Sequence, residues 1–175
     1  MMKHTSLLLT LFIAASAHAA PPKEFAPLEP QAVFEKLKEL AGAWRGYLGK
    51  EGNSAGIDFH VTAGGSVVME TIFPGTPKET VSMYFLNRGE LTLVQYGVVG
   101  NQPEMLYDRK HSTPAVFVFK FDGGRGFSMR DDVHIHDGTI KIADAQHLES
   151  TWSEWKQGKP AAEYRFVLTR ATKQP

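Results

Sequence analysis

His134 and His136 are separated by one residue within a stretch of strand-forming residues. Side chains two apart in a strand point to the same face, so a regular strand would place both imidazoles side by side. Imidazole nitrogens bind zinc and copper, but two ligands are too few for a stable site. Candidates for the missing ligands are His60, His111, His147 and Glu70. The pair therefore predicts either a metal site or two histidines that hydrogen-bond within the sheet.

Tyr107, Arg109 and His111 also alternate, which predicts a second polar face if this stretch is a strand. Turned inward, it would anchor a carboxylate or phosphate head group, because the Arg109 guanidinium can donate two parallel hydrogen bonds. Turned outward, it would be a solvated edge beside the Ser112-Thr113-Pro114 turn.

Glu70 lies between Met69 and Thr71 in an otherwise apolar stretch. A buried carboxylate without a partner costs several kcal/mol or takes up a proton. We therefore expect Glu70 either to face solvent or to pair, with Arg109 or a histidine as partner. A general base beside the histidine pair would suit an enzyme. The chain has no G-x-S-x-G or H-E-x-x-H motif and no cysteine, so we assign no catalytic residue and favour binding over catalysis.

Aromatic residues recur with a period of two, as in Phe117, Phe119 and Phe121. Such rings form either a packed core or the apolar wall of a small-molecule site, in which a few polar groups orient the ligand. The residues that we expect to bind a ligand are Glu70, Tyr84, Tyr96, Tyr107, Arg109, His111 and Phe119.

One helix and about ten strands must position these residues. Residues 31–41 place apolar side chains at helical spacing, with Pro30 at the start and Gly42 at the stop. After Gly42 the apolar period changes to two. The predicted strands are Ala43–Leu48, Ile57–Thr62, Val67–Phe73, Val81–Asn87, Leu91–Val98, Met105–Lys110, Val116–Phe121, Val133–Ala143, Leu148–Trp155 and Glu163–Arg170. Short turns rich in Gly, Asn and Pro separate them, which predicts an antiparallel up-and-down barrel.

The N-terminus predicts export. Lys3, an apolar run from Leu7 to Ala15 and the sequence Ala17-His18-Ala19 have the order of a cleaved signal peptide, residues 1–19. Residues 20–30 are expected to form an extended lead-in and residues 31–175 the barrel domain. We therefore expect a periplasmic or secreted protein without an integral membrane segment in the mature chain. Nucleic acid is not an expected partner, because 19 basic residues balance 19 acidic ones without a basic stripe.

Gly42-Ala43-Trp44, placed between the helix and the first strand, resembles the start of calycin-type barrels, the group of lipocalins, fatty-acid-binding proteins and nitrobindin-like proteins. The whole domain is similar to uncharacterised exported bacterial lipocalin-like proteins, in stretches such as Glu70–Pro77 and Gly100–Pro103. The resemblance implies that Trp44 packs at a closed end under a basic residue of the last strand, for which Arg170 is the match. Nitrobindin-like proteins bind haem, so the resemblance makes haem a possible cofactor of this chain. A divalent metal is a second possible cofactor, and neither is favoured.

The sequence thus predicts an all-β, ten-stranded lipocalin-like barrel with one N-terminal helix that binds a small hydrophobic or amphipathic molecule. Two alternatives stay open. One is a metal- or histidine-dependent enzyme at the barrel mouth, and the other is a filled barrel that acts by binding a partner on its surface.

Overall fold

The computed structural model describes residues 26–50, 52–128 and 132–172. The predicted signal peptide and residues 20–25 of the predicted lead-in lie outside this range. Residues 26–29 precede the helix without regular secondary structure. None of the helices in the described ranges is long and apolar enough to cross a membrane.

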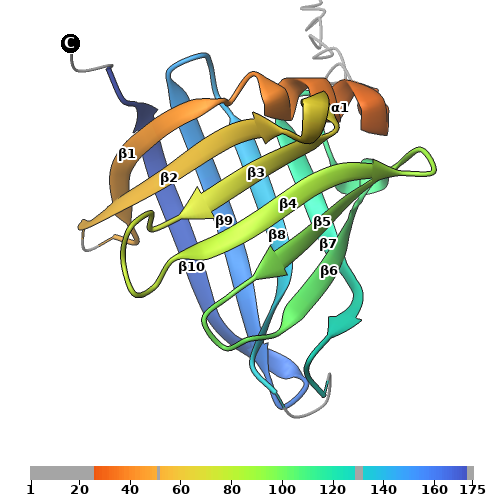
Figure 1. Cartoon of the computed structure of the whole chain (residues 1–175), viewed down its shortest axis with the longest axis vertical. Coiled ribbons are helices and arrows are strands. Elements are labelled where there is room, and N and C mark those ends of the chain that lie inside the picture. Colours follow the sequence, from red (N-terminus) through yellow and green to blue (C-terminus); the bar gives the residue numbers. More distant parts are fainter. Residues whose placement is uncertain (1–25, 51, 129–131, 173–175) are drawn as a thin grey trace, which may run out of the picture.

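Ten strands form a closed barrel in which each strand is antiparallel to its neighbours in the chain, and β10 closes the sheet by pairing with β1 (Figure 1). The strands are β1 (Gly42–Leu48), β2 (Asn53–Thr62), β3 (Val67–Ile72), β4 (Thr80–Asn87), β5 (Glu90–Tyr96), β6 (Gln102–Tyr107), β7 (Val116–Arg125), β8 (His134–Ile142), β9 (His147–Lys156) and β10 (Lys159–Arg170). The helix α1 (Pro30–Lys38) precedes them, and short 3-10 turns η1 (Ala63–Gly65) and η2 (Arg109–His111) interrupt the series. The predicted fold class is confirmed.

The strand predicted over residues 105–110 ends earlier in the structure than expected. The strand expected over residues 105–110 is β6, which ends at Tyr107 and is followed by η2. The Asp108 side chain accepts a hydrogen bond from the His111 backbone N–H, and this contact stabilises the turn. Arg109 and His111 therefore do not continue the alternating face on which Tyr107 lies.

β8 also departs from a regular strand. Its register with β9 shifts between Ile135 and Asp137, which leaves His136 as an additional residue. A bulge sets two residues opposite one and ends the simple alternation of faces. His134 is consequently buried, whereas His136 is half-buried.

The end of the barrel beside α1 is closed by packed side chains. The helix lies across this end (Figure 1) and buries Val33, Phe34 and Leu37, and Leu40 is buried just after it. Trp44 is fully buried beneath it, and its Nε1–H donates a hydrogen bond to the carbonyl of Leu40 at 2.8 Å.

Arg170 covers Trp44 from the last strand. Its Cζ lies 4.3 Å from the centre of the indole ring, and its guanidinium donates to the carbonyls of Glu39 and Ala41. A cation over an aromatic face is attracted by about 0.5–2 kcal/mol. Gly42 makes room for this arrangement: its φ is +126°, and a Cβ there would lie 3.3 Å from Arg170 Nη1. The helix, the first strand and the last strand are thereby joined at one point.

Inward-facing apolar side chains continue from this end into the middle of the barrel. They are Ile57, Phe59, Val68, Tyr84, Leu91, Leu93, Met105, Phe117, Phe119, Ile140, Leu148 and Leu168, each at most 4% exposed. The interior next to the helix is therefore a solid core, and any hollow must lie toward the opposite end.

Candidate functional site

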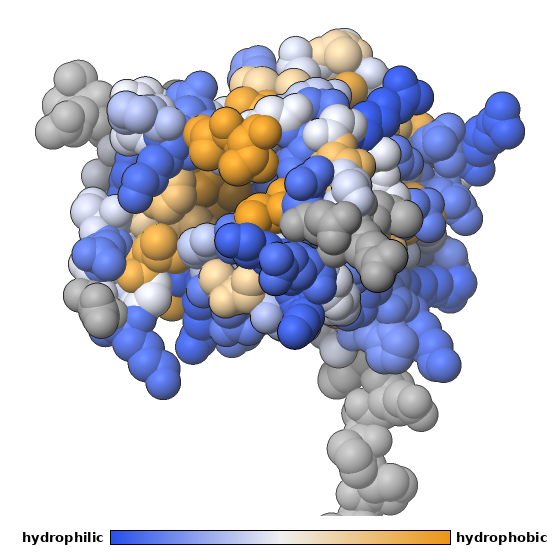
Figure 2. Space-filling model, turned by 90° about the horizontal axis from the view of Figure 1, so that it is seen from below, coloured by the Kyte–Doolittle hydropathy of each residue, from blue (hydrophilic) through white to orange (hydrophobic). Residues whose placement is uncertain are grey.

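A cavity of about 370 Å³ opens at the end of the barrel opposite α1. Figure 2 views this end and shows hydrophobic residues around a hollow with hydrophilic residues at its rim. The lining comes from the strand ends and from the β3–β4 and β5–β6 loops. It consists of Leu48, Ile72, Phe73, Lys78, Thr80, Gln95, Gly97, Val98, Val99, Asn101, Val133, His134, Ile135, Trp152, Glu154, Tyr164 and Phe166.

The walls of the cavity are mainly apolar and aromatic. Phe73 and Phe166 pack with their ring centres 5.5 Å apart, and Trp152 and Tyr164 add two further aromatic surfaces. Small-molecule sites in proteins usually have volumes of roughly 300–1,000 Å³ and combine apolar walls with a few polar groups. This cavity lies at the small end of that range.

Trp152 lies flat against β8 because its cross-strand neighbour is Gly138. A Cβ at Gly138 would lie 2.2 Å from Trp152 Cζ3, so any other residue there would displace the indole. Trp152 is 2% exposed, and its Nε1–H has no hydrogen-bond partner in the described part of the chain. A buried N–H without a partner costs free energy, and this one belongs to a side chain that borders the cavity.

A row of three polar residues crosses the inner wall of the barrel, on the side of the cavity that faces the helix end. Glu70, Ser82 and Gln95 lie directly opposite one another on β3, β4 and β5, and all three are buried. Tyr84 Oη donates to Glu70 Oε2 at 2.7 Å. Neither Glu70 Oε1 nor Ser82 Oγ makes a hydrogen bond of normal geometry with the described residues. The row reaches the cavity through Gln95, and β3 reaches it through Ile72.

Burial determines the protonation of Glu70 and of its partner Tyr84. It raises the pKa of Glu70 to about 7, although the hydroxyl groups of Tyr84 and Ser82 oppose the shift. Burial, together with the nearby carboxylate, raises the pKa of Tyr84 well above its ordinary value. Tyr84 therefore stays protonated and donates, while the Glu70 carboxyl changes its charge near neutral pH.

A second Glu–Tyr pair lies at the mouth. Tyr164 Oη donates to Glu154 Oε2 at 2.9 Å, and both residues line the cavity. Burial and the Glu154 carboxylate raise the pKa of Tyr164. Next to this pair the β5–β6 loop exposes two apolar side chains, Val98 at 67% and Val99 at 61%. The mouth thus carries one carboxylate and an apolar lip.

The two histidines meet at the same end of the barrel. His134 Nε2 lies 3.2 Å from His136 Nδ1, and His134 Nδ1 lies 3.0 Å from the Asp132 carbonyl. Because a carbonyl only accepts, His134 Nδ1 carries a proton, and one ring donates to the other across the Nε2–Nδ1 contact. The His136 ring stacks on Trp155 with centres 3.7 Å apart, and burial lowers the pKa of His136.

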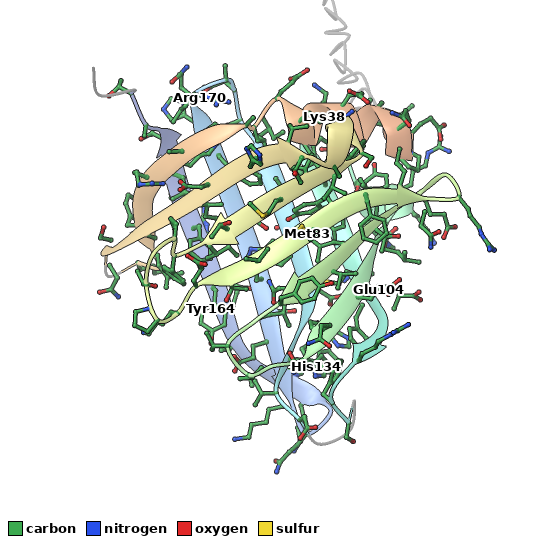
Figure 3. All side chains as sticks on the ribbon, in the orientation of Figure 1. Lys38, Met83, Glu104, His134, Tyr164 and Arg170 are labelled. Carbon is green, nitrogen blue, oxygen red and sulfur yellow. The ribbon has the colours of Figure 1, made fainter. Side chains whose placement is uncertain are left out.

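Two imidazole nitrogens at this separation could share a metal ion, but the rest of a ligand set is missing from the described residues. Within them, no group of three or more His, Asp, Glu or Cys side chains is placed to hold a metal ion. His134 lines the cavity and lies far from Arg170 along the barrel (Figure 3). The two histidines remain a predicted metal pair, and the contacts that the structure shows are their mutual hydrogen bond and aromatic stacking.

Among the residues expected to bind a ligand, Glu70, Tyr84 and Phe119 are buried in the interior and do not line the cavity. The Tyr84 and Phe119 rings pack edge to face with centres 5.5 Å apart. The expectation that Arg109 or a histidine pairs with Glu70 was wrong, because the partner is Tyr84. Tyr96 is 48% exposed and does not line the cavity.

Tyr107, Arg109 and His111 lie near the start of α1 instead. Arg109 Nη2 forms an ion pair with Glu29 at 2.6 Å, and Tyr107 Oη donates to the Leu28 carbonyl at 3.0 Å. His111 is exposed and pairs with Asp108, which precedes it in the turn. None of the three lines the cavity, so the structure does not bring the expected polar anchor to it.

The residues that do line the cavity were mostly not predicted. They include Gln95, Trp152, Glu154, Tyr164 and Phe166. Strand alternation carried part of the signal, because Trp152 and Glu154 share the inner face of β9, as Tyr164 and Phe166 share that of β10. Which end of the barrel is hollow, however, depends on packing that spacing does not encode.

Comparisons with protein-family models and with curated proteins find no match to this chain.

Proposed function

We propose that this chain is an exported calycin-type barrel that binds a small amphipathic molecule in the cavity at its open end. The observation that carries the proposal is the apolar cavity of about 370 Å³, which a closed sheet surrounds and which has unpaired buried polar atoms beside it. Export and the calycin relationship rest on the N-terminal sequence and on the triplet that begins with Gly42.

The cavity favours a ligand with an apolar body. Moving apolar surface out of water is favourable by about 25 cal/mol per Å², and the walls offer aliphatic and aromatic side chains for this contact. The polar side chains of the lining are the Glu154–Tyr164 pair and Lys78, Thr80, Gln95, Asn101 and His134. Such an arrangement orients one polar group while the apolar walls supply affinity.

Isothermal titration calorimetry with 1-decanol, a neutral single-chain amphiphile, tests the proposal. Wild-type protein is expected to bind decanol at one site. Ile135→Trp fills part of the cavity and should weaken binding by about tenfold or more, which is about 1.4 kcal/mol.

The matched control is Thr139→Trp, on the same strand but not in the cavity lining. It should bind decanol as the wild type does. Absence of binding to the wild type, or an equal loss in both variants, would contradict the proposal. Export is tested separately: protein recovered outside the cytoplasm should begin at Ala20, and an intact N-terminus would rule out cleavage after Ala19.

A further inference from the structure

The buried polar residues around the interior include an acid but no fixed positive charge. In the described part of the chain they are Glu70, Ser82, Thr92, Gln95, Asn101, Ser112, His134 and Ser150. None of them is Lys or Arg. Lys78 is a basic side chain in the cavity lining, but it belongs to the exposed β3–β4 loop. The interior therefore offers no buried cation to hold the head group of an acid.

Glu70 is the charged counterpart that this interior does offer. It is fully buried, and its Oε1 makes no hydrogen bond of normal geometry while Tyr84 satisfies Oε2. Burying a carboxylate is costly unless it is paired. Glu70 lies two residues from Ile72 on the same face of β3, and Ile72 lines the cavity. Because strand residues rise about 3.3 Å each, the backbone positions of Glu70 and Ile72 are about 7 Å apart along the strand.

The aromatic lining points the same way. Phe73, Trp152, Tyr164 and Phe166 all border the cavity. The faces of aromatic rings attract cations, and sets of such rings are used to bind ammonium groups. Glu154 adds a second carboxylate at the mouth. An anionic head group would lie near two carboxyl groups and the negative ring faces, with only the exposed Lys78 to attract it, whereas a cationic head group is attracted by both carboxylates and by the rings.

We propose that the ligand of this cavity carries a protonated amine, whose charge is balanced by the Glu70 carboxylate beyond the Gln95 and Ile72 wall. The proposal rests on the proposed function and names the ligand class of the same cavity. The Gln95 side-chain carbonyl, on the same cross-strand row as Glu70, accepts a hydrogen bond from the amine.

Three probes with one chain length and different head groups test this proposal: decylamine, 1-decanol and decanoate. Calorimetry at about pH 8 keeps the amine protonated and Glu70 mostly ionised. We expect decylamine to bind at least about tenfold more tightly than decanoate, with decanol between them. Glu70→Gln should reduce decylamine affinity by about tenfold and leave decanol affinity within about twofold, which also shows that the variant is folded.

Glu154→Gln is the matched control, because Glu154 is a second carboxyl that accepts from a tyrosine but lies at the mouth. It should reduce the preference for the amine much less than Glu70→Gln. The inference is overturned if decanol binds but decylamine binds no more tightly than decanoate. It is also overturned if only the Glu154 variant loses the preference. If none of the three probes binds, the proposed function itself fails.

Discussion

The two ends of this barrel use similar residue types to opposite effect. At the helix end, Trp44 is buried with its N–H bonded to Leu40, and Arg170 covers its ring. At the open end, Trp152 is equally buried, but its N–H has no partner among the described residues, and a cavity adjoins it. A hydrogen-bonded indole and a cation packed on its ring make one end structural. Unpaired polar atoms beside a hollow make the other end suited to a ligand.

The contrast extends to the carboxyl groups. Near the helix, Glu29 pairs with Arg109 at the surface, where solvent screens the ion pair and its contribution is small. Inside, Glu70 accepts a hydrogen bond from the Tyr84 hydroxyl, and burial raises its pKa to about 7. A protein that needed only stability would have an apolar residue at this position, since an imperfectly satisfied buried polar group is unfavourable. The open half of the barrel thus gives up stability that the closed half retains.

The largest effect is expected at the closed end. Trp44→Ala should lower the free energy of unfolding by about 3–5 kcal/mol, because it removes a fully buried indole, one hydrogen bond and the contact with Arg170. Urea unfolding measures the change. Trp155→Ala, at a half-buried position near the open end, is the control and should cost clearly less. Equal losses would mean that the helix end is not the more tightly packed one.

The second effect depends on pH and concerns Glu70. Its pKa is about 7 in the folded protein and near 4.5 when unfolded, so the folded state binds more protons between these values. The contribution of Glu70 to the free energy of unfolding is therefore fully present below about pH 4.5. It is lost as the pH rises through about 7, by about 3 kcal/mol in total.

Glu70→Gln removes this titration. Urea unfolding at about pH 5 and pH 8 should show that the variant loses most of the pH dependence and is more stable than the wild type at the higher pH. Glu154→Gln, at the mouth, should keep the wild-type slope. An unchanged slope in Glu70→Gln would show that another group titrates.

The smallest effect on stability is expected at the apolar lip. Val98→Ser should change the free energy of unfolding by less than about 0.5 kcal/mol, because Val98 is 67% exposed. It should nevertheless weaken decanol binding, since Val98 borders the cavity. Val33→Ser, the same substitution in the helix, buries a hydroxyl at a position with no exposure and should cost about 2 kcal/mol or more. A Val98→Ser variant that is less stable than Val33→Ser would contradict the contrast between the two ends.

The parts of this structure that follow from local spacing could be predicted from the sequence. A period of two from Ala43 onward, broken by turn residues, is enough to indicate antiparallel strands, and their number indicates closure. The resemblance to calycin-type barrels, and not spacing, implied Arg170 as the residue over Trp44, and the structure places its Cζ 4.3 Å from the ring centre.

The candidate site depends on features that spacing does not contain. Alternating spacing predicts that Arg109 shares a face with Tyr107, but the turn that Asp108 stabilises ends β6 at Tyr107. The partner of Glu70 is 14 residues away and is set by the register of β3 with β4. The cavity arises because Gly138 lets Trp152 lie flat and because the β5–β6 loop does not fill the mouth. These are tertiary contacts, and the residue spacing within a single strand does not predict them.

One NMR titration compares both ends in a single spectrum. The indole N–H groups of Trp44 and Trp152 give separate signals, one from each end of the barrel, in an amide correlation spectrum of nitrogen-15-labelled protein. With 1-decanol, we expect the Trp152 indole signal and the backbone signals of residues 97–101 to shift with the same affinity, while the Trp44 signal stays in place. Shifts confined to Trp44 and α1, with Trp152 unchanged, would contradict a ligand site at the open end.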